Sequence, residues 1–314
     1  MKNKLSSSIH TLSADKKKLP LFIKLFWIFI NFINNNLPPK KIINKGSLIK
    51  VKKLNIIPSH INWHLLNLHS RKSPSRLICD LFWSKLPWKS IKDEIGQINI
   101  FDTGCGEGGY ALFLNGFINN INSYVGIDFY KRDNWQELMN QNSFITLIEN
   151  SSSNISELID KDINLFITQS AIEHFNHDLK YFQQIKTFVD KKQTNIIQIH
   201  LFPSPVCLWL YLLHGVRQYN FKSILKIVDI FKSTNSYFRI FPLGGNYSNT
   251  FHFFNITIPN LFNIFFKNRW HLNFNTQYKE KLKKAVVQDL KDGISNNPSF
   301  YALVIHSNYS KVIF

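Results

Sequence analysis

The sequence predicts an α/β fold, with a mostly parallel sheet, an antiparallel closing strand and helices on both faces. Between residues 98 and 201, short apolar runs alternate with segments of helical periodicity, as in sheets whose parallel strands are joined by crossover helices. A glycine-rich stretch directly follows the first apolar run, at 104–109. A last apolar run at 300–306 follows a long amphipathic segment and is suited to close the sheet.

The first 41 residues form a basic and apolar leader. Three lysines at 16–18 precede an apolar run from Leu21 to Ile33, and Pro38-Pro39 with Lys40-Lys41 follow it. The run is shorter than the roughly 20 residues of a membrane-spanning helix, and no small-residue cleavage site follows. We expect residues 16–41 to make a peripheral contact at the inner face of the membrane. The alternative is a helix packed on the domain.

The charge distribution argues against a nucleic-acid-binding protein. Residues 1–99 hold 18 Lys/Arg and four acidic residues, a net charge of +14, whereas residues 100–314 hold 20 and 16, a net charge of +4. A nucleic-acid-binding surface would also place positive charge on the folded body. The three cysteines, at 79, 105 and 207, show no metal-ligand spacing, so we expect no metal and a reducing, cytoplasmic location.

The elements are predicted in the following order. Residues 42–97 form a helical lead-in, in which Ser73-Pro74 starts a helix. The domain covers 98–314, with strands at 98–102, 123–128, 143–148, 163–168 and 195–201. Helices begin near Gly108, Asp133, Asn154 and Asn176. The regular pattern breaks down after residue 203, so residues 203–275 are interpreted as a lid inserted over the sheet's functional edge, before a helix at 276–291.

The glycine-rich stretch indicates a ligand site at that edge. Gly104, Gly106 and Gly108 follow Asp102 at the end of an apolar strand and lead directly into a helix. Glycine lets the backbone turn sharply and a ligand approach closely, and crevices at the carboxyl ends of parallel strands bind ligands. Asp128 ends the next strand, where a carboxylate can accept hydrogen bonds from both hydroxyls of a ribose. The alternative for Asp128 is a cap for the turn after Phe129.

These residues, with Gln169-Ser170-Ala171-Ile172-Glu173-His174-Phe175 after the fourth strand, resemble the class I, Rossmann-like S-adenosylmethionine-dependent methyltransferases over about residues 97–202. Many small-molecule members of that family share the Glu-His ending. The resemblance implies S-adenosyl-L-methionine as cofactor. It also implies that Asp102, Gly104 and Gly106 line the cofactor's methionine portion, with Gly108 as a further cofactor contact, and that Asp128 holds the ribose. Phe129 would contact the adenine face and Asn150 or Ser151 the adenine amine, and Ser170 would face the cofactor at the end of the fourth strand. The family often has Asp where this chain has Asn150.

Two other interpretations stay open. The glycines at 104, 106 and 109 also satisfy the dinucleotide fingerprint of nicotinamide-dependent oxidoreductases. Asp102, the Glu173-His174 pair and the long lead-in favour methyl transfer over that reading. A non-catalytic relative that binds the cofactor or a partner at the membrane is the second alternative.

Candidate residues for the chemistry follow the strands. His174 is the leading general base, since histidine titrates in the useful range, although it can instead cap the helix expected at 176. Glu173 can orient a neighbouring group or the substrate, and His200, expected at the end of the fifth strand, is the second candidate base. His214, Arg217 and Tyr219 are candidate substrate contacts in the lid. By resemblance the acceptor is a small molecule, such as a sugar of a surface glycan or lipid-linked precursor.

Overall fold

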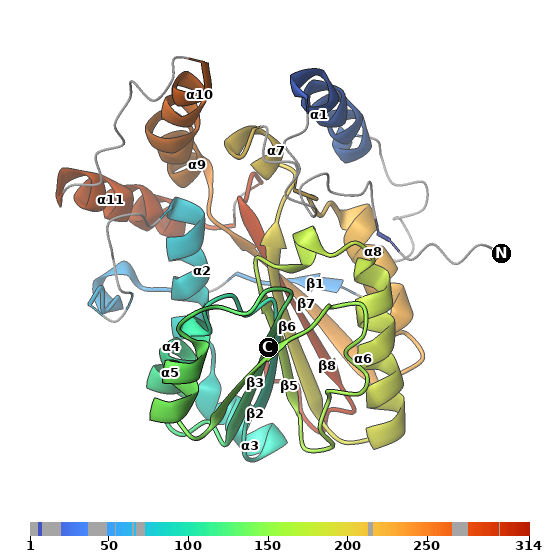
Figure 1. Cartoon of the computed structure of the whole chain (residues 1–314). Helices are drawn as coiled ribbons and strands as arrows, with labels where there is room; N and C mark the ends of the chain where they lie inside the picture. Colours follow the sequence, from blue (N-terminus) through green and yellow to red (C-terminus); the bar gives the residue numbers. More distant parts are fainter. Residues whose placement is uncertain are drawn as a thin grey trace.

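The structure, a computed structural model, describes residues 6–7, 20–36, 49–53, 55–64, 66, 73–212, 216–265, 276–294 and 296–314. Within these ranges one eight-stranded sheet runs in the order β1-β7-β8-β6-β5-β2-β3-β4 (Figure 1). The strands are β1 (Ile49–Val51), β2 (Asn99–Thr103), β3 (Ser123–Asp128), β4 (Ile145–Glu149), β5 (Leu165–Gln169), β6 (Ile196–Pro203), β7 (Ser236–Leu243) and β8 (Phe300–Ser307). β8 runs antiparallel to β6 and β7, and the other pairs are parallel. The predicted fold class is confirmed.

Helices cover both faces of the sheet (Figure 1). The described helices are α1 (Leu21–Asn36), α2 (Pro74–Ser84), α3 (Trp88–Ile95), α4 (Gly109–Ile118), α5 (Trp135–Gln141), α6 (Asp178–Lys192), α7 (Cys207–Leu210), α8 (Phe221–Ile230), α9 (Asn246–His252), α10 (Ile258–Phe265) and α11 (Thr276–Asp292), with short turns η1 (Pro58–His60), η2 (Ile172–His174) and the π-helical η3 (Phe253–Thr257). Side chains of α2, α3, α4 and α11 share one buried cluster, and those of α6 and α8 share the other.

The sheet separates these two clusters because successive strand residues point to opposite faces. In β2, Ile100 packs with α2 and α4, whereas the next residue, Phe101, packs with α6 and α8. β2, β5, β6 and β8 are buried along their whole length. Strands covered by helices on both faces are expected to be continuously apolar. Of the polar side chains in these strands, Asp102 and Thr103 of β2 and Thr168 and Gln169 of β5 lie at the carboxyl ends.

Three local predictions are corrected by the structure. No helix begins near Asn154, where the chain forms turns instead. The lead-in at 42–97 is not only helical, since it supplies the edge strand β1. Residues 236–243, placed in the predicted lid, form the strand β7, which pairs with β8 along its length. The predicted strands at 98–102, 123–128, 143–148, 163–168, 195–201 and 300–306 and the helix at 276–291 correspond to observed elements.

The helix α1 lies beyond the carboxyl end of the sheet, near α7 (Figure 1). It buries Trp27 and Asn31, and its Phe32 ring lies 5.9 Å from the ring of Trp209. Asn220 donates a hydrogen bond to the carbonyl of Asn34 at 3.1 Å. In the described parts of the chain, no helix combines the length and the apolar character needed to cross a membrane.

Candidate functional site

The loop between β2 and α4 adopts a conformation that requires glycine. Gly104 has φ +83°, and a Cβ there would lie 2.4 Å from the Cβ of Ala171, so any side chain would displace the segment after β5. Gly106 has φ +58°, and a Cβ there would meet nothing within 4 Å. Left-handed φ favours glycine at both positions. The N–H of Gly106 donates to Asp128 and its carbonyl accepts from Nε1 of Trp135, each at 2.9 Å, so both polar groups of this backbone unit are held in place.

Asp128, at the end of β3, turns its carboxylate toward this loop. Its Oδ2 accepts the N–H of Gly106 at 2.9 Å, and its Oδ1 lies 3.3 Å from Nη2 of Arg132. Oδ1 also accepts the N–H of Tyr130 at 3.2 Å, so the turn contact considered as an alternative is made as well. The Asp128 side chain remains 14% exposed. The carboxylate is thus fixed against the glycine loop while part of it faces solvent.

A cleft of about 740 Å³, from here on called the cleft, opens beside Asp128. It lies at the carboxyl ends of β2, β3, β4 and β5, the place where open parallel sheets bind ligands. Its lining residues are Thr103, Gly104, Ile127, Asp128, Phe129, Tyr130, Arg132, Asn150, Ser151, Ser152, Ser153, Ser170, Ala171, His174, Phe175, Asn176 and His177. Seven of the predicted site residues are therefore brought together: Gly104, Asp128, Phe129, Asn150, Ser151, Ser170 and His174. Phe129 is 62% exposed, so its ring is available to a ligand.

Asp102, Gly106 and Gly108, all predicted to contact the cofactor, do not line the cleft. Asp102 is buried, and its Oδ2 accepts the hydroxyl of Tyr124 at 2.5 Å. Burial raises the pKa of Asp102 to about 7, against the hydrogen bond from Tyr124, which lowers it. Its Oδ1 has no hydrogen-bond partner among the described residues. At Gly108 a Cβ would lie 2.9 Å from Leu138, so this glycine serves the packing of α5.

A smaller hollow of about 180 Å³, named the chamber, adjoins the cleft. It is lined by Ser73, Ser75, Arg76, Cys79, Gln169, Ser170, Glu173, His174, Pro203, Tyr211, Val216 and Phe300. Ser170 and His174 line both spaces. A reacting group placed between these two residues would therefore be reachable from the cleft on one side and from the chamber on the other.

Glu173 and His174 differ in their surroundings. Glu173 is 2% exposed and accepts the hydroxyl of Ser170 at 2.5 Å on Oε1, whereas its Oε2 has no partner among the described residues. Burial raises the pKa of Glu173 to about 7, against the hydrogen bond from Ser170. His174 has an exposed side chain. The pKa of its imidazole is lowered, first because neighbouring protein atoms displace part of the solvent around the ring and second because of the positive charge of Arg217. Because α6 begins only at residue 178, His174 does not cap it.

His200 lies away from this site, and its predicted position is wrong. β6 continues to Pro203, so residue 200 is inside the strand rather than at its end. The ring is fully buried, with Nδ1 3.1 Å from the hydroxyl of Thr168, and it packs 4.9 Å from the ring of Phe182. Burial lowers the pKa of His200 to about 3. It does not line the cleft or the chamber.

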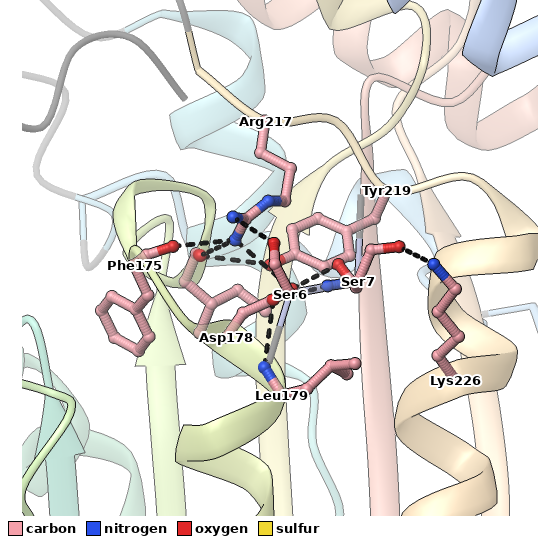
Figure 2. Close-up of polar contacts among 9 residues, drawn as sticks. Ser6, Ser7, Phe175, Asp178, Leu179, Arg217, Tyr219 and Lys226 are labelled. Atoms are coloured by element: carbon pink, nitrogen blue, oxygen red, sulfur yellow. Dashed lines mark hydrogen bonds and ion pairs between the residues drawn. The ribbon is translucent and has the colours of Figure 1, made fainter. Parts of the chain in front are cut away.

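Arg217 and Tyr219 hold the structure together instead of facing a substrate, which corrects their predicted place. Figure 2 shows both side chains directed at Asp178, the first residue of α6. Nη1 of Arg217 lies 3.3 Å from Asp178 and donates to the carbonyl of Phe175 at 2.9 Å. The hydroxyl of Tyr219 donates to Asp178 at 2.9 Å. Both side chains are 0% exposed. His214 lies outside the described residues.

The N-terminal segment completes this cluster (Figure 2). Ser7 donates its N–H to Asp178 at 2.8 Å and also its hydroxyl. Nη2 of Arg217 donates to the hydroxyl of Ser6 at 2.9 Å, and Lys226 donates to the carbonyl of Ser7. A buried charge is tolerated when it is paired with an opposite charge, as Arg217 is with Asp178, although Nε of Arg217 has no hydrogen-bond partner among the described residues. The cluster thus fixes the start of α6, directly after the cleft residues 174–177.

Two arginines at the site were missed by the sequence analysis. Arg132 lines the cleft and pairs with Asp128 four residues before it, a spacing that the sequence displays. Arg76 lines the chamber from α2. Nothing in the sequence indicates that the lead-in reaches the carboxyl end of β5. Among the described residues no group of three or more His, Cys, Asp or Glu side chains could hold a metal ion.

Comparison with known proteins gives structural neighbours only. No family model and no curated protein matches the chain. A candidate sarcosine dimethylglycine methyltransferase from Galdieria sulphuraria is 15% identical, with a TM-score of 0.45 and coverage of 81% of this chain and 99% of that one. The plantazolicin methyltransferase BamL, solved with a triazolic desmethylPZN analog and SAH, is 13% identical, with a TM-score of 0.45 and coverage of 80% of this chain and 90% of that one. A SAM-dependent methyltransferase from Archaeoglobus fulgidus is 13% identical, with a TM-score of 0.43 and coverage of 79% and 100%.

Proposed function

We propose that this chain is an S-adenosylmethionine-dependent methyltransferase that acts on an oxygen or nitrogen atom of a small molecule. The observation that carries the proposal is the carboxylate of Asp128, fixed by the N–H of Gly106 at 2.9 Å at the edge of the cleft. A carboxylate at the end of the second of two adjacent parallel strands, next to a glycine loop, is suited to hold the two hydroxyls of a ribose.

The residues around the loop fit the remaining parts of this cofactor. The exposed ring of Phe129 offers an apolar face for adenine, and Asn150 and Ser151 offer polar groups for its amine. On the other side of the loop, Oδ1 of Asp102 is buried without a partner among the described residues. Buried polar atoms of this kind need a hydrogen-bond partner, and the amino group of the methionine portion is one that Gly104, Gly106 and Asp102 would hold.

When bound, the cofactor supplies an electrophilic methyl group carried on a sulfonium sulfur. The protein therefore has to hold the acceptor in line with that group and to remove a proton from it. We assign proton removal to His174, at the junction of cleft and chamber. Its lowered pKa keeps the imidazole neutral, and so able to accept a proton, near pH 7. Glu173 then orients the acceptor, and Ser170 lies beside the reacting groups.

The chamber supports a small acceptor. A volume of about 180 Å³ corresponds to roughly a dozen water-sized positions. A single sugar ring is of this size, which agrees with a sugar of a surface glycan or lipid-linked precursor as the acceptor.

Calorimetric titration with S-adenosylhomocysteine and with NAD tests the cofactor assignment. We expect one site for S-adenosylhomocysteine and no NAD binding, whereas binding of NAD alone would establish the oxidoreductase alternative. Release of S-adenosylhomocysteine in the presence of candidate acceptors then tests turnover. Cofactor binding without release against any acceptor would favour a non-catalytic binding protein.

We also propose that α1 brings the enzyme to the inner face of the membrane. Seven apolar side chains of this helix are at least 41% exposed: Leu21, Phe22, Leu25, Phe26, Phe29, Phe32 and Ile33. Lysines at 16–18, 40 and 41 flank the helix in the sequence, a combination that favours binding to anionic lipid surfaces. Each phenylalanine that enters the interface completely contributes about 1.5–3 kcal/mol.

Co-sedimentation with vesicles tests this contact. We expect binding to vesicles of phosphatidylcholine mixed with phosphatidylglycerol, weaker binding at high salt, and loss of binding when Phe22, Phe26 and Phe29 are replaced by Ser. The matched control is Phe254→Ser, because Phe254 is 61% exposed on the separate segment η3. Failure of the unmodified protein to sediment with these vesicles would remove the proposal.

A further inference from the structure

The residues that line the chamber indicate what kind of acceptor it binds. This inference rests on the proposed function. We propose that the chamber binds a ring-shaped acceptor that bears both a carboxylate and a hydroxyl, the carboxylate pairing with Arg76 and the hydroxyl donating to Glu173. The residues that are proposed to bind the cofactor do not by themselves imply such an acceptor. It follows from the guanidinium of Arg76 and the carboxyl group of Glu173, which α2 and the segment after β5 place in the chamber wall.

Arg76 is held in position by its neighbours on one side. Its Nη1 donates to the hydroxyl of Tyr110 at 3.2 Å, and its guanidinium carbon lies 5.8 Å from the centre of the Tyr110 ring. The same hydroxyl donates to Oδ1 of Asp80 at 2.5 Å. Arg76 is the one lysine or arginine among the described residues that line the chamber. A planar guanidinium fixed in this way is suited to bind a carboxylate through two parallel hydrogen bonds.

Glu173 supplies the second contact. Its Oε1 is occupied by the hydroxyl of Ser170, but Oε2 is buried and has no partner among the described residues. Ser170 itself has φ +53°, a strained conformation for a residue other than glycine and one that is often found at functional sites. A buried oxygen without a donor is costly. A hydroxyl of the acceptor would supply that donor next to His174.

The other residues that line the chamber indicate the size and polarity of the acceptor's ring. Tyr211, Val216, Pro203 and Phe300 present apolar and aromatic surface between the polar groups, as in most small-molecule sites. A six-membered ring fits within the volume of about 180 Å³ and can pack against this surface. Hydroxybenzoic acids and sugar acids are two kinds of compound that combine such a ring with a carboxylate and a hydroxyl.

The test compares acids with their neutral counterparts. Protein saturated with S-adenosylhomocysteine is titrated calorimetrically with 4-hydroxybenzoate and 4-hydroxybenzamide, and with glucuronate and glucose. We expect at least one acid to bind about tenfold or more tightly than its neutral counterpart, since an ionic hydrogen-bonded contact is lost in the latter. The ring type that binds identifies the source of the acceptor.

Variants assign the preference to the two side chains. Arg76→Gln is expected to abolish the preference for the acid while the affinity for S-adenosylhomocysteine stays within threefold, roughly the scatter of an indirect effect. Lys85→Gln is the matched control, because Lys85 follows the same helix and contacts the carbonyl of His60, and it should keep the preference. Removing the hydroxyl, by using benzoate, should weaken binding in the unmodified protein but not in Glu173→Leu.

The outcomes separate this inference from the proposed function. Equal affinity for acid and neutral compound in both ring types, including no binding of either, would overturn the inference, as would an acid preference that survives Arg76→Gln. The comparison of ligands needs only the unmodified protein, so it stands even where a variant fails to fold. An acid preference in a protein that does not bind S-adenosylhomocysteine would support the chamber assignment and contradict the proposed function.

Discussion

Replacing Asp128 by Asn tests how the ribose is held. Asn preserves the size of the side chain but removes its negative charge, and one of its two terminal atoms can only donate. Since Oδ2 of Asp128 accepts the N–H of Gly106 at 2.9 Å and Oδ1 lies 3.3 Å from Arg132, the amide nitrogen must face one of these donors or turn toward the ligand. Either orientation removes an acceptor that the ribose hydroxyls need.

The expected loss can be estimated from the contacts. A hydrogen bond to a charged group contributes about 1.5–3 kcal/mol, and the ribose would make two of them. Asn removes one of these bonds and turns the other into a neutral one, a loss of about 2.5–4.5 kcal/mol in all. At about 1.4 kcal/mol per factor of ten, this weakens the affinity by about 50-fold or more. Isothermal titration calorimetry with S-adenosylhomocysteine measures this change directly. Asp128→Ala, which removes both oxygens, is expected to abolish detectable binding.

Glu149→Gln is the matched control for this experiment. Glu149 pairs in register with Asp128 on the neighbouring strand and does not line the cleft, so the same chemical change there should leave the affinity unaltered. Thermal unfolding of each variant shows whether the fold persists. Unchanged affinity in a folded Asp128→Asn protein, or an equal loss in Glu149→Gln, would refute the reasoning.

Three further predictions concern the chemistry and the stability of the site. His174→Ala should leave the affinity for S-adenosylhomocysteine unchanged and slow turnover by about 100-fold or more, as measured by product release; normal turnover would show that His174 is not the base. Arg217→Met leaves Asp178 buried without its cation and should lower the free energy of unfolding by about 3–5 kcal/mol in urea titrations, whereas a loss below about 1 kcal/mol would contradict the role of the cluster. Because the folded-state pKa of Glu173 is raised from 4.5 to about 7, its contribution to stability is full below pH 4.5 and is lost as the pH rises to about 7. The stability of Glu173→Gln relative to the unmodified protein should therefore increase by about 3 kcal/mol between these pH values, and a difference that does not change with pH would be inconsistent with a buried, neutral carboxyl.

The parallel part of the fold was predictable because its signals are local. β2, β3 and β6 are apolar runs bounded by polar or glycine-rich turns. The glycines between residues 104 and 108 predict the turn into α4. β7 carries no such signal. Arg239 lies inside it and Pro242 near its end. Arg239 is accommodated by hydrogen bonds to the carbonyls of Phe314 and Phe238 and by its position over the ring of Tyr237. A strand that depends on distant partners cannot be read from its own residues.

The residues of the site also fall into those that the sequence predicts and those that it does not. The cleft residues follow strands whose ends the sequence indicates, so Asp128, Ser170 and His174 were placed correctly. Arg217 and Tyr219 look like ligand-binding residues in an apolar segment, but their partner, Asp178, lies on another element. The chamber combines residues of α2, of the segment after β5 and of β8. Only the packing of the whole domain brings these groups together.

A crystal structure of the protein with S-adenosylhomocysteine tests the central claim most directly. We expect the nucleoside in the cleft, with both ribose hydroxyls about 2.5–3.0 Å from the carboxylate of Asp128 and the thioether sulfur directed at the chamber between Ser170 and His174. A nucleoside bound elsewhere, or an Asp128 carboxylate that makes no contact with the ribose, would contradict the account.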